Sequence, residues 1–363
     1  MNILIDIGHP AHVHYFKLIA KYFIGKNDSV LFVTRDKEVT INLLRHYNFN
    51  FINIGKFYTS FLGKIWGLFW FTIKLGLIAL KFKPDVYLNA TFYSSFVAWI
   101  LRKPHISIED TFNKESTSLF MPFTSIVITG DYPHPSLGAK EISVSAYQEL
   151  LYLHPKYFVP DKSVLNELKV NEKEKYVIMR FVSWKATHDA GHKGISLENK
   201  VRAVREFGKY GKVFISSEAE LPAELNPYKI NIAPHKMHDA IAFASLIIGE
   251  SFTMLSEAAV LGTPAVLIHD TKCYYLQEQQ NKYGLTFNYT ESEEDQLKAI
   301  NKGIEILKTP NIKEKWQGRR EKMLNDKIDF TAFLIWFVEN YPGSVKIIKE
   351  NPDYQRRFVG LSD

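Results

Sequence analysis

Four short stretches of the sequence place titratable side chains beside glycine, proline or a helix start. The first is IDIGHPAHVHYF, residues 5–16, where His9 and His12 follow a buried apolar run. Gly8 permits a tight exit, and a histidine at a helix start could act as a general base or donate a hydrogen bond to phosphate. The alternative is that these histidines only cap and pack the turn. Their spacing is not a standard metal-binding one, so we predict no metal site.

The second stretch is ISIEDTF, residues 106–112, in which Glu109 and Asp110 come directly after another apolar run. Paired carboxyl groups at the end of a strand are suited to acid–base chemistry or to binding sugar hydroxyls. Alternatively, they cap a helix or lie in a solvated loop. Both interpretations remain open from the sequence.

The third stretch is MRFVSWKATHDAGHKG, residues 179–194, which carries basic and aromatic side chains after a third apolar run. Cationic side chains could hold a diphosphate, and an indole offers a stacking face. A surface loop with scattered charges is the alternative. The candidate residues are Arg180, Trp184, Lys185 and His188.

The fourth stretch is GESFTMLSEAAVLGTPAVLIHD, residues 249–270, where Ser251, Phe252 and Thr253 form a turn before an apolar helix. Serine and threonine are good capping residues, and the free N–H groups of a helix start attract phosphate. Glu257 lies too far along the helix for a capping box. We therefore interpret its carboxylate as a ligand for both hydroxyls of a ribose, with a solvated side chain as the alternative.

Short apolar runs alternate with helical patterns along the chain, which predicts parallel strands joined by crossover helices. Ligands bind beyond the carboxyl ends of such strands, where the four stretches lie. We predict an α/β fold of two doubly wound, Rossmann-like domains facing a cleft, residues 1–155 and 156–363, with a helical C-terminus. The strands that we expect in the second domain are residues 175–181, 212–217, 228–233, 246–251 and 264–270.

Composition narrows the class of partner and the compartment. The 363 residues carry a net charge of +6, and the pI of about 9.0 suits anionic ligands. No arginine-rich tract or zinc-finger spacing points to nucleic acid. One cysteine, Cys273, and an N-terminus without secretory-signal features favour the cytoplasm, either free or at the inner membrane face.

An aromatic-rich segment, residues 57–83, raises the question of membrane contact. Lys64 and Lys74 interrupt it, so no run reaches the ~18 apolar residues of a membrane span. Lys74 and Lys81 share a helical face. A wide apolar sector with a narrow basic stripe fits a core helix, which we favour, or an interfacial helix on anionic lipid.

Two parts of the sequence resemble known families. IAPHKMHDAIAFASLIIGES and TMLSEAAVLGTPAVLIHD, residues 232–251 and 253–270, resemble the nucleotide-binding half of GT-B proteins, which include non-hydrolysing UDP-GlcNAc 2-epimerases and the peptidoglycan GlcNAc transferase. IDIGHPAHVHYF and ELLYLHPKYFVPD look like a bacterial and archaeal family known only as a domain of unknown function, which is grouped with GT-B enzymes. The resemblance covers nearly the whole chain.

The resemblance implies roles for individual residues. Ser251 and Thr253 match the diphosphate-binding turn, and Glu257 matches the glutamate that holds the ribose. His12 matches the histidine of the first-domain loop in many GT-B transferases. Glu109 matches a glutamate used by the epimerases.

The chain also departs from these relatives. Phe252 and Thr253 stand where the phosphate turn usually has two glycines. The epimerases place an aspartate after the strand that here ends in Asn89-Ala90-Thr91, which weakens the epimerase interpretation.

We therefore expect a metal-independent glycosyltransferase without a cofactor, with His12 or Glu109 as the base. Its donor would be a nucleoside-diphosphate sugar, with UDP as the expected nucleotide. Its acceptor would be a glycan or lipid-linked molecule, in cell-surface polysaccharide or glycolipid synthesis. The alternatives are a UDP-GlcNAc 2-epimerase-like enzyme and a non-catalytic module that binds nucleotide sugars.

Overall fold

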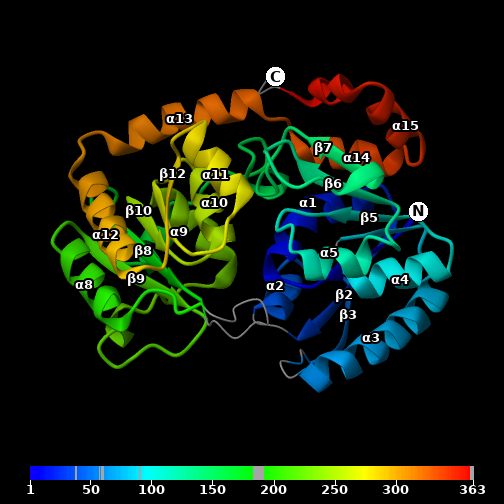
Figure 1. Ribbon diagram of the computed structural model, residues 1–363, viewed down its shortest axis with the longest axis horizontal. Helices are drawn as coiled ribbons and strands as arrows, with labels where there is room; N and C mark the ends of the chain where they lie inside the picture. Colours follow the sequence, from blue (N-terminus) through cyan, green and yellow to red (C-terminus); the bar gives the residue numbers. More distant parts are fainter. Residues whose placement is uncertain (37–38, 57, 59–60, 90, 183–191, 360–363) are drawn as a thin grey trace. The chain divides into compact units, whose positions relative to one another are not determined.

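The computed structural model describes residues 1–36, 39–56, 58, 61–89, 91–182 and 192–359. The chain divides into two compact units (Figure 1). The first comprises Met1–Tyr152 and Lys327–Asp363, and the second comprises Leu153–Asp326. The division near residue 153 lies close to the predicted boundary. Residues 327–363, which we assigned to the second domain, belong instead to the first unit.

The described residues of the first unit form a seven-stranded sheet in the order β3-β2-β1-β4-β5-β6-β7. All neighbouring strands pair in parallel. The strands are β1 (Asn2–Ile7), β2 (Ser29–Asp36), β3 (Phe51–Lys56), β4 (Val86–Leu88), β5 (His105–Ile108), β6 (Ile126–Gly130) and β7 (Glu141–Val144).

Helices alternate with these strands, as the sequence pattern predicts. They are α1 (Pro10–Gly25), α2 (Thr40–His46), α3 (Phe61–Phe82), α4 (Phe92–Ile100), α5 (Lys114–Phe120) and α6 (Leu150–Leu153), with the 3₁₀ turn η1 (Gly138–Lys140). One face of the sheet, including Leu4 and Tyr87, packs against Phe71 and Leu75 of α3 and Val97 of α4. Because side chains alternate along a strand, the neighbours of Leu4 point to the opposite face.

The C-terminal helices complete the first unit. They are α14 (Phe330–Glu339), α15 (Gly343–Glu350) and η5 (Pro352–Phe358). The Thr331 hydroxyl donates to the carbonyl of Leu151 at 2.9 Å, and the buried ammonium of Lys327 lies 2.6 Å from Asp131 Oδ1. These contacts explain why the chain end belongs to the first unit.

The described residues of the second unit form a five-stranded parallel sheet in the order β12-β11-β10-β8-β9. Its strands are β8 (Tyr176–Phe181), β9 (Lys212–Ser217), β10 (Leu246–Gly249), β11 (Ala265–Ile268) and β12 (Thr286–Tyr289). Its helices are α7 (Ser163–Glu167), α8 (Leu197–Phe207), α9 (Met237–Phe243), α10 (Phe252–Leu261), α11 (Tyr274–Asn281), α12 (Glu293–Lys308) and α13 (Ile312–Asp326), with η3 (Asn226–Tyr228) and η4 (Pro234–Lys236).

Two predicted features of the second sheet are wrong. Residues 228–233 do not form a strand, and only an isolated bridge joins Lys229 to Ile215. None of these six residues is buried, so they gain little from joining the sheet. Conversely, β12 was not among the strands that we predicted for this domain. It is short and half polar, and its pairing with β11 defines it.

Candidate functional site

The loop after β1 is organised by its own histidines. His9 is the N-cap of α1, and its Nδ1 accepts a hydrogen bond from the Ala11 N–H at 3.2 Å. Pro10 occupies the first turn, where its missing N–H costs nothing. His9 therefore caps α1, which was the alternative to a ligand-binding role in the sequence analysis.

His12 is held in one tautomer. Its Nδ1 accepts the Gly8 N–H at 3.2 Å and lies 2.6 Å from Asn89 Nδ2. The same amide nitrogen donates to the Asp6 carbonyl at 2.6 Å, which fixes the orientation of the Asn89 amide because its oxygen would repel that carbonyl. With two donors facing Nδ1, the imidazole proton lies on Nε2. Neutral His12 is therefore a hydrogen-bond donor at Nε2 rather than a base.

A buried ion pair lies beside this loop. Asp6 is fully buried and accepts hydrogen bonds from Arg35 Nη2 at 3.3 Å and from the Thr91 hydroxyl. Arg35 Nη2 also donates to the Ile7 carbonyl at 2.9 Å, and its guanidinium lies 4.8 Å from the Tyr93 ring centre. Within the described chain, Arg35 Nη1 is buried without a hydrogen-bond partner. Sequence reasoning missed this pair, although an aspartate near the end of an apolar strand is the available signal.

Glu109 binds the turn that follows it. Its Oε1 accepts the Thr111 N–H at 2.8 Å, the Thr111 hydroxyl at 2.6 Å and the Phe112 N–H at 2.8 Å. Burial raises the pKa of the Glu109 carboxyl, although these hydrogen bonds oppose the rise. The geometry gives Glu109 a capping role in its own loop.

Asp110 lies in a different environment from its neighbour. The Tyr15 hydroxyl donates to Asp110 Oδ2 at 3.1 Å, and the Tyr15 ring lies 5.6 Å from the His12 ring. Burial, reinforced by the charge of Glu109, raises the pKa of Asp110 to about 7. A carboxyl group with this pKa exchanges protons near neutral pH. The structure thus brings Asp110, Tyr15 and His12 together at the carboxyl ends of β1 and β5.

In the second unit, the start of α10 has the predicted cap. Ser251 is the N-cap, and its Oγ accepts the Met254 N–H at 3.4 Å. The Phe252 ring lies 4.2 Å from the His269 ring, so the bulky side chain stacks beside the turn. Thr253 is half-buried in the first turn. The helix ends at Gly262, whose φ of 76° is the expected left-handed stop.

Glu257 is buried on α10, so the alternative of a solvated side chain is wrong. Its Oε1 lies 2.9 Å from Nε2 of His238, which is also buried and belongs to α9. This partner explains how an apolar helix carries a carboxylate. Whether Glu257 also binds a ribose stays a prediction.

Arg180 is already paired. Its Nη1 donates to Ser216 Oγ at 3.0 Å, and its Nη2 bonds to the Glu218 carboxylate. Glu218 offsets the positive charge that would otherwise attract a diphosphate. The other candidates from this stretch, Trp184, Lys185 and His188, lie outside the described residues.

Glu250, at the end of β10, is a functional candidate that the sequence analysis did not identify. Its Oε2 accepts the Val182 N–H at 2.8 Å, and its Oε1 accepts the Ile195 N–H at 2.7 Å. Lys200 Nζ lies 3.7 Å from Oε1. The buried Glu250 carboxylate therefore binds Val182 and Ile195, which lie on either side of residues 183–194 of the third stretch. Its place in the turn before Ser251 is the signal that could have found it.

His192, His269 and Glu291 form a cluster whose candidate ligand atoms lie within 4.8 Å of one another. These three could hold a metal ion, but hydrogen bonds already link the cluster. Glu291 accepts from His192 Nδ1 at 2.5 Å and from the Lys193 and Gly194 N–H groups at 2.9 Å. Burial of Glu291 raises its pKa, but these hydrogen bonds lower it by more, so the pKa of Glu291 lies below its usual value. The cluster lies beside α10 through the Phe252–His269 contact.

The chain belongs to the family described as "Protein of unknown function (DUF354)", which matches residues 1–330. It is also similar to "Uncharacterized protein MJ0665" of Methanocaldococcus jannaschii, with 25% identity over 283 residues. That match covers 73% of this chain and 81% of the relative.

Solved structures with the same fold have little sequence in common with this chain. An S. aureus MnaA–UDP structure is 11% identical with a TM-score of 0.69, covering 95% of this chain and 98% of the other. UDP-GlcNAc 2-epimerase from Neisseria meningitidis bound to UDP-GlcNAc is 15% identical with a TM-score of 0.64, covering 87% and 94%. Glycosyltransferase VinC in complex with dTDP is 12% identical with a TM-score of 0.59, covering 97% and 100%. These similarities confirm the predicted GT-B fold of two Rossmann-like domains with a helical C-terminus.

Proposed function

We propose that this member of the DUF354 family is a glycosyltransferase that takes a sugar from a nucleoside diphosphate, with UDP as the expected nucleotide. The acceptor would be a hydroxyl of a glycan or lipid-linked molecule used in cell-surface polysaccharide or glycolipid synthesis. The observation that carries the proposal is Asp110, a carboxyl group with a pKa of about 7 beside Tyr15. Transfer to a hydroxyl needs one base that works near neutral pH, and Asp110 meets that need.

The second unit supports nucleotide binding. In the MnaA and N. meningitidis structures, proteins of the same fold are bound to UDP and UDP-GlcNAc. The start of α10 presents the N–H groups of its first turn, and Thr253 lies in the same turn. We assign the diphosphate to this helix start and the ribose to Glu257, which His238 orients. We leave Arg180 out because Glu218 binds its guanidinium.

The first unit would supply the acid–base chemistry. Asp110 takes the proton from the acceptor hydroxyl while the acceptor oxygen forms a bond to the anomeric carbon of the sugar. The bond from that carbon to the diphosphate breaks, and the positive end of α10 stabilises the negative charge that leaves. His12 donates a hydrogen bond from Nε2 to an oxygen of the sugar or acceptor. This assignment replaces His12 as the base, because its Nδ1 accepts two hydrogen bonds.

An epimerase of the same fold is the competing function. Elimination and return of the nucleotide need several acid–base groups, and Asn89 stands where the epimerases have an aspartate. The Asn89 amide contacts the Asp6 carbonyl and His12, so this position offers no acid or base. Glu109 binds its own turn. These contacts favour transfer over epimerisation.

The test follows the proton at C2 of the sugar. The protein is incubated with UDP-N-acetylglucosamine and other UDP-sugars in heavy water, and the recovered nucleotide sugar is examined by mass spectrometry. We expect no deuterium at C2, and release of UDP only when a glycan or lipid acceptor is added. Deuterium at C2 that disappears in Asp110→Asn would replace the transferase with an epimerase. Calorimetric binding of UDP without turnover of any donor would favour the non-catalytic module.

A further inference from the structure

Helix α3 is apolar on the side that packs against the sheet and also on the side that faces outward. Phe71, Leu75 and Ala79 are buried in the core of the first unit. The outward side carries five large apolar side chains that are 54–64% exposed: Trp66, Phe69, Ile73, Leu77 and Leu80. A surface helix normally presents polar side chains to water. The outward side of α3 therefore lacks the composition of a surface that stays in water.

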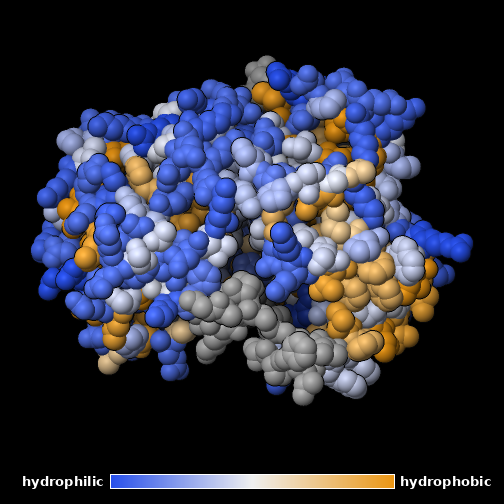
Figure 2. Space-filling view, in the orientation of Figure 1, coloured by the Kyte–Doolittle hydropathy of each residue, from blue (hydrophilic) through white to orange (hydrophobic). Residues whose placement is uncertain are grey.

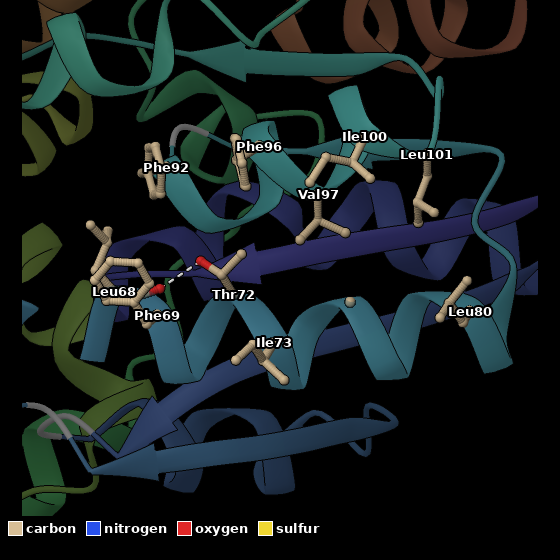
Figure 3. A pocket seen from close by; sticks show the side chains of 11 residues that line it. Leu68, Phe69, Thr72, Ile73, Leu80, Phe92, Phe96, Val97, Ile100 and Leu101 are labelled. Carbon is tan, nitrogen blue, oxygen red and sulfur yellow. Dashed lines mark hydrogen bonds between the residues drawn. The ribbon is translucent and has the colours of Figure 1, made fainter. Parts of the chain in front are cut away.

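Helix α4 extends this apolar surface. Trp99 and Ile100 are also more than half exposed. Between α3 and α4 lies a groove of about 480 Å³, lined by Leu68, Phe69, Thr72, Ile73, Gly76, Leu80, Phe92, Phe96, Val97, Ile100 and Leu101 (Figure 3). Thr72 is the one described lining residue with a polar side chain, and its hydroxyl donates to the Leu68 carbonyl at 2.6 Å. The groove thus offers an apolar lining that suits a hydrocarbon chain.

The charges around this surface are basic. Neither α3 nor α4 contains an aspartate or glutamate. Exposed cations follow at the end of the groove where Leu80 and Leu101 lie: Lys81, Lys83, Arg102 and Lys103. Asp85 is the nearby acid, 3.7 Å from Lys103. Lys74 does not belong to this rim, because its ammonium donates to the Ile54 carbonyl at 2.7 Å.

We propose that the α3–α4 surface docks on a lipid bilayer that contains anionic headgroups. Figure 2 shows apolar side chains gathered over these two helices. Indole rings are favoured at the boundary between hydrocarbon and water, where Trp66 and Trp99 would lie, and the basic rim would contact the headgroups. Among the described residues, no helix is long and apolar enough to cross a membrane.

A second copy of the chain fits this surface less well. A two-fold dimer would bring the basic rims of both copies to one interface, with no acid on either helix to pair with them. An anionic leaflet neutralises the same charges. Charge complementarity therefore favours a bilayer, and the proposal is independent of the transfer reaction.

The test is sedimentation with vesicles of phosphatidylcholine alone or with phosphatidylglycerol added. We expect the wild-type protein to sediment with the anionic vesicles and to be released by salt. The triple variant Phe69→Gln, Leu77→Gln, Leu80→Gln should bind at least about tenfold less, because three exposed apolar side chains are lost. The matched control replaces apolar residues exposed elsewhere: Val159→Gln, Leu197→Gln, Ile347→Gln. It should bind as the wild type does.

A charge series tests the rim separately. Lys81→Gln, Lys83→Gln, Arg102→Gln should lower binding to anionic vesicles, whereas Lys315→Gln, Lys322→Gln, Lys346→Gln should not. Circular dichroism and thermal melting verify that each variant is folded. Equal sedimentation of both apolar variants would overturn the proposal. A doubled mass in light scattering that the α3 variant abolishes, without vesicle binding by the wild type, would replace the bilayer with a second copy.

Discussion

The Asn89 amide determines which nitrogen of His12 can contact a ligand. By donating to Nδ1, it leaves the imidazole proton on Nε2 and leaves Asp110 as the nearby group that can accept a proton near pH 7. Asp110 must be ionised to act as a base. Activity is therefore expected to rise with pH through about 7 and then level off, which a pH–rate profile would measure.

Replacement of Asp110 tests this role directly. Asp110→Asn keeps an acceptor for Tyr15, and should lower kcat by about 10²–10⁴-fold with little change in donor KM. Glu109→Gln is the comparison: because Glu109 binds its own turn, kcat at pH 8 should be kept, but loss of the charge that raises the pKa of Asp110 should shift the pH–rate profile to lower pH. A pH–rate profile that is unchanged in Asp110→Asn would refute the assignment.

The same group makes a prediction about stability. The folded pKa of Asp110 lies above its ordinary value of 3.8, so the folded state binds the proton more tightly than the unfolded state. That contribution is fully present below about pH 4 and is lost as pH rises through about 7. Asp110→Asn should therefore raise the free energy of unfolding at pH 8 by on the order of 1–3 kcal/mol, and should have little effect at pH 4. Urea titrations at the two pH values measure the difference.

Glu257 and His238 form a pair, and we expect their replacement to change UDP affinity by different amounts. Glu257→Ala should weaken UDP binding by on the order of 2–3 kcal/mol in calorimetry, because the ribose loses a charged acceptor. His238→Ala removes the partner of the carboxylate but leaves the proposed ribose ligand. An equal loss of affinity in both folded variants would mean that the pair is only structural.

At the scale of elements, the apolar strands were predictable, and the short, half-polar edge strand β12 was not. The run NILIDI is apolar enough to identify β1, and the starts of α1 and α10 follow from His9, Pro10 and Ser251. The four residues of β12 are half polar, and its pairing with β11 distinguishes it. The residues of the candidate site were also only partly predictable from the sequence. Strand ends located His12 and Asp110, but the Asn89 contact and the His238–Glu257 pair join residues far apart in sequence.

Glu250 binds two described residues that flank the connection between β8 and α8, through the Val182 and Ile195 N–H groups. Glu250→Gln should weaken one of these bonds and leave a buried amide donor poorly paired. We expect faster hydrogen exchange at Val182 and Ile195 and a loss of stability of about 1–3 kcal/mol. Glu218→Gln, on the strand-end loop that binds Arg180, is the control and should leave both amides protected.

At the scale of the whole molecule, the chain end stabilises the unit to which it returns. Lys327 is buried, bonds to Asp131 and lies 4.6 Å from the Tyr147 ring centre. Lys327→Ala should lower stability by about 1–3 kcal/mol and increase hydrogen exchange in β6 and β7, but should leave UDP affinity unchanged. Lys346→Ala, at an exposed position on α15, should change neither. Loss of protection in β8–β12 instead would contradict this division of the chain.

The return of residues 327–363 to the first unit also sets an order of events during synthesis. The second unit, Leu153–Asp326, is one uninterrupted segment, whereas the first unit is assembled from both ends of the sequence. On the ribosome, the second unit can complete its core as soon as residue 326 has emerged. We expect the first unit, although it is made earlier, to complete its core only after α14 has emerged. We therefore expect the half of the protein that is translated first to finish folding last.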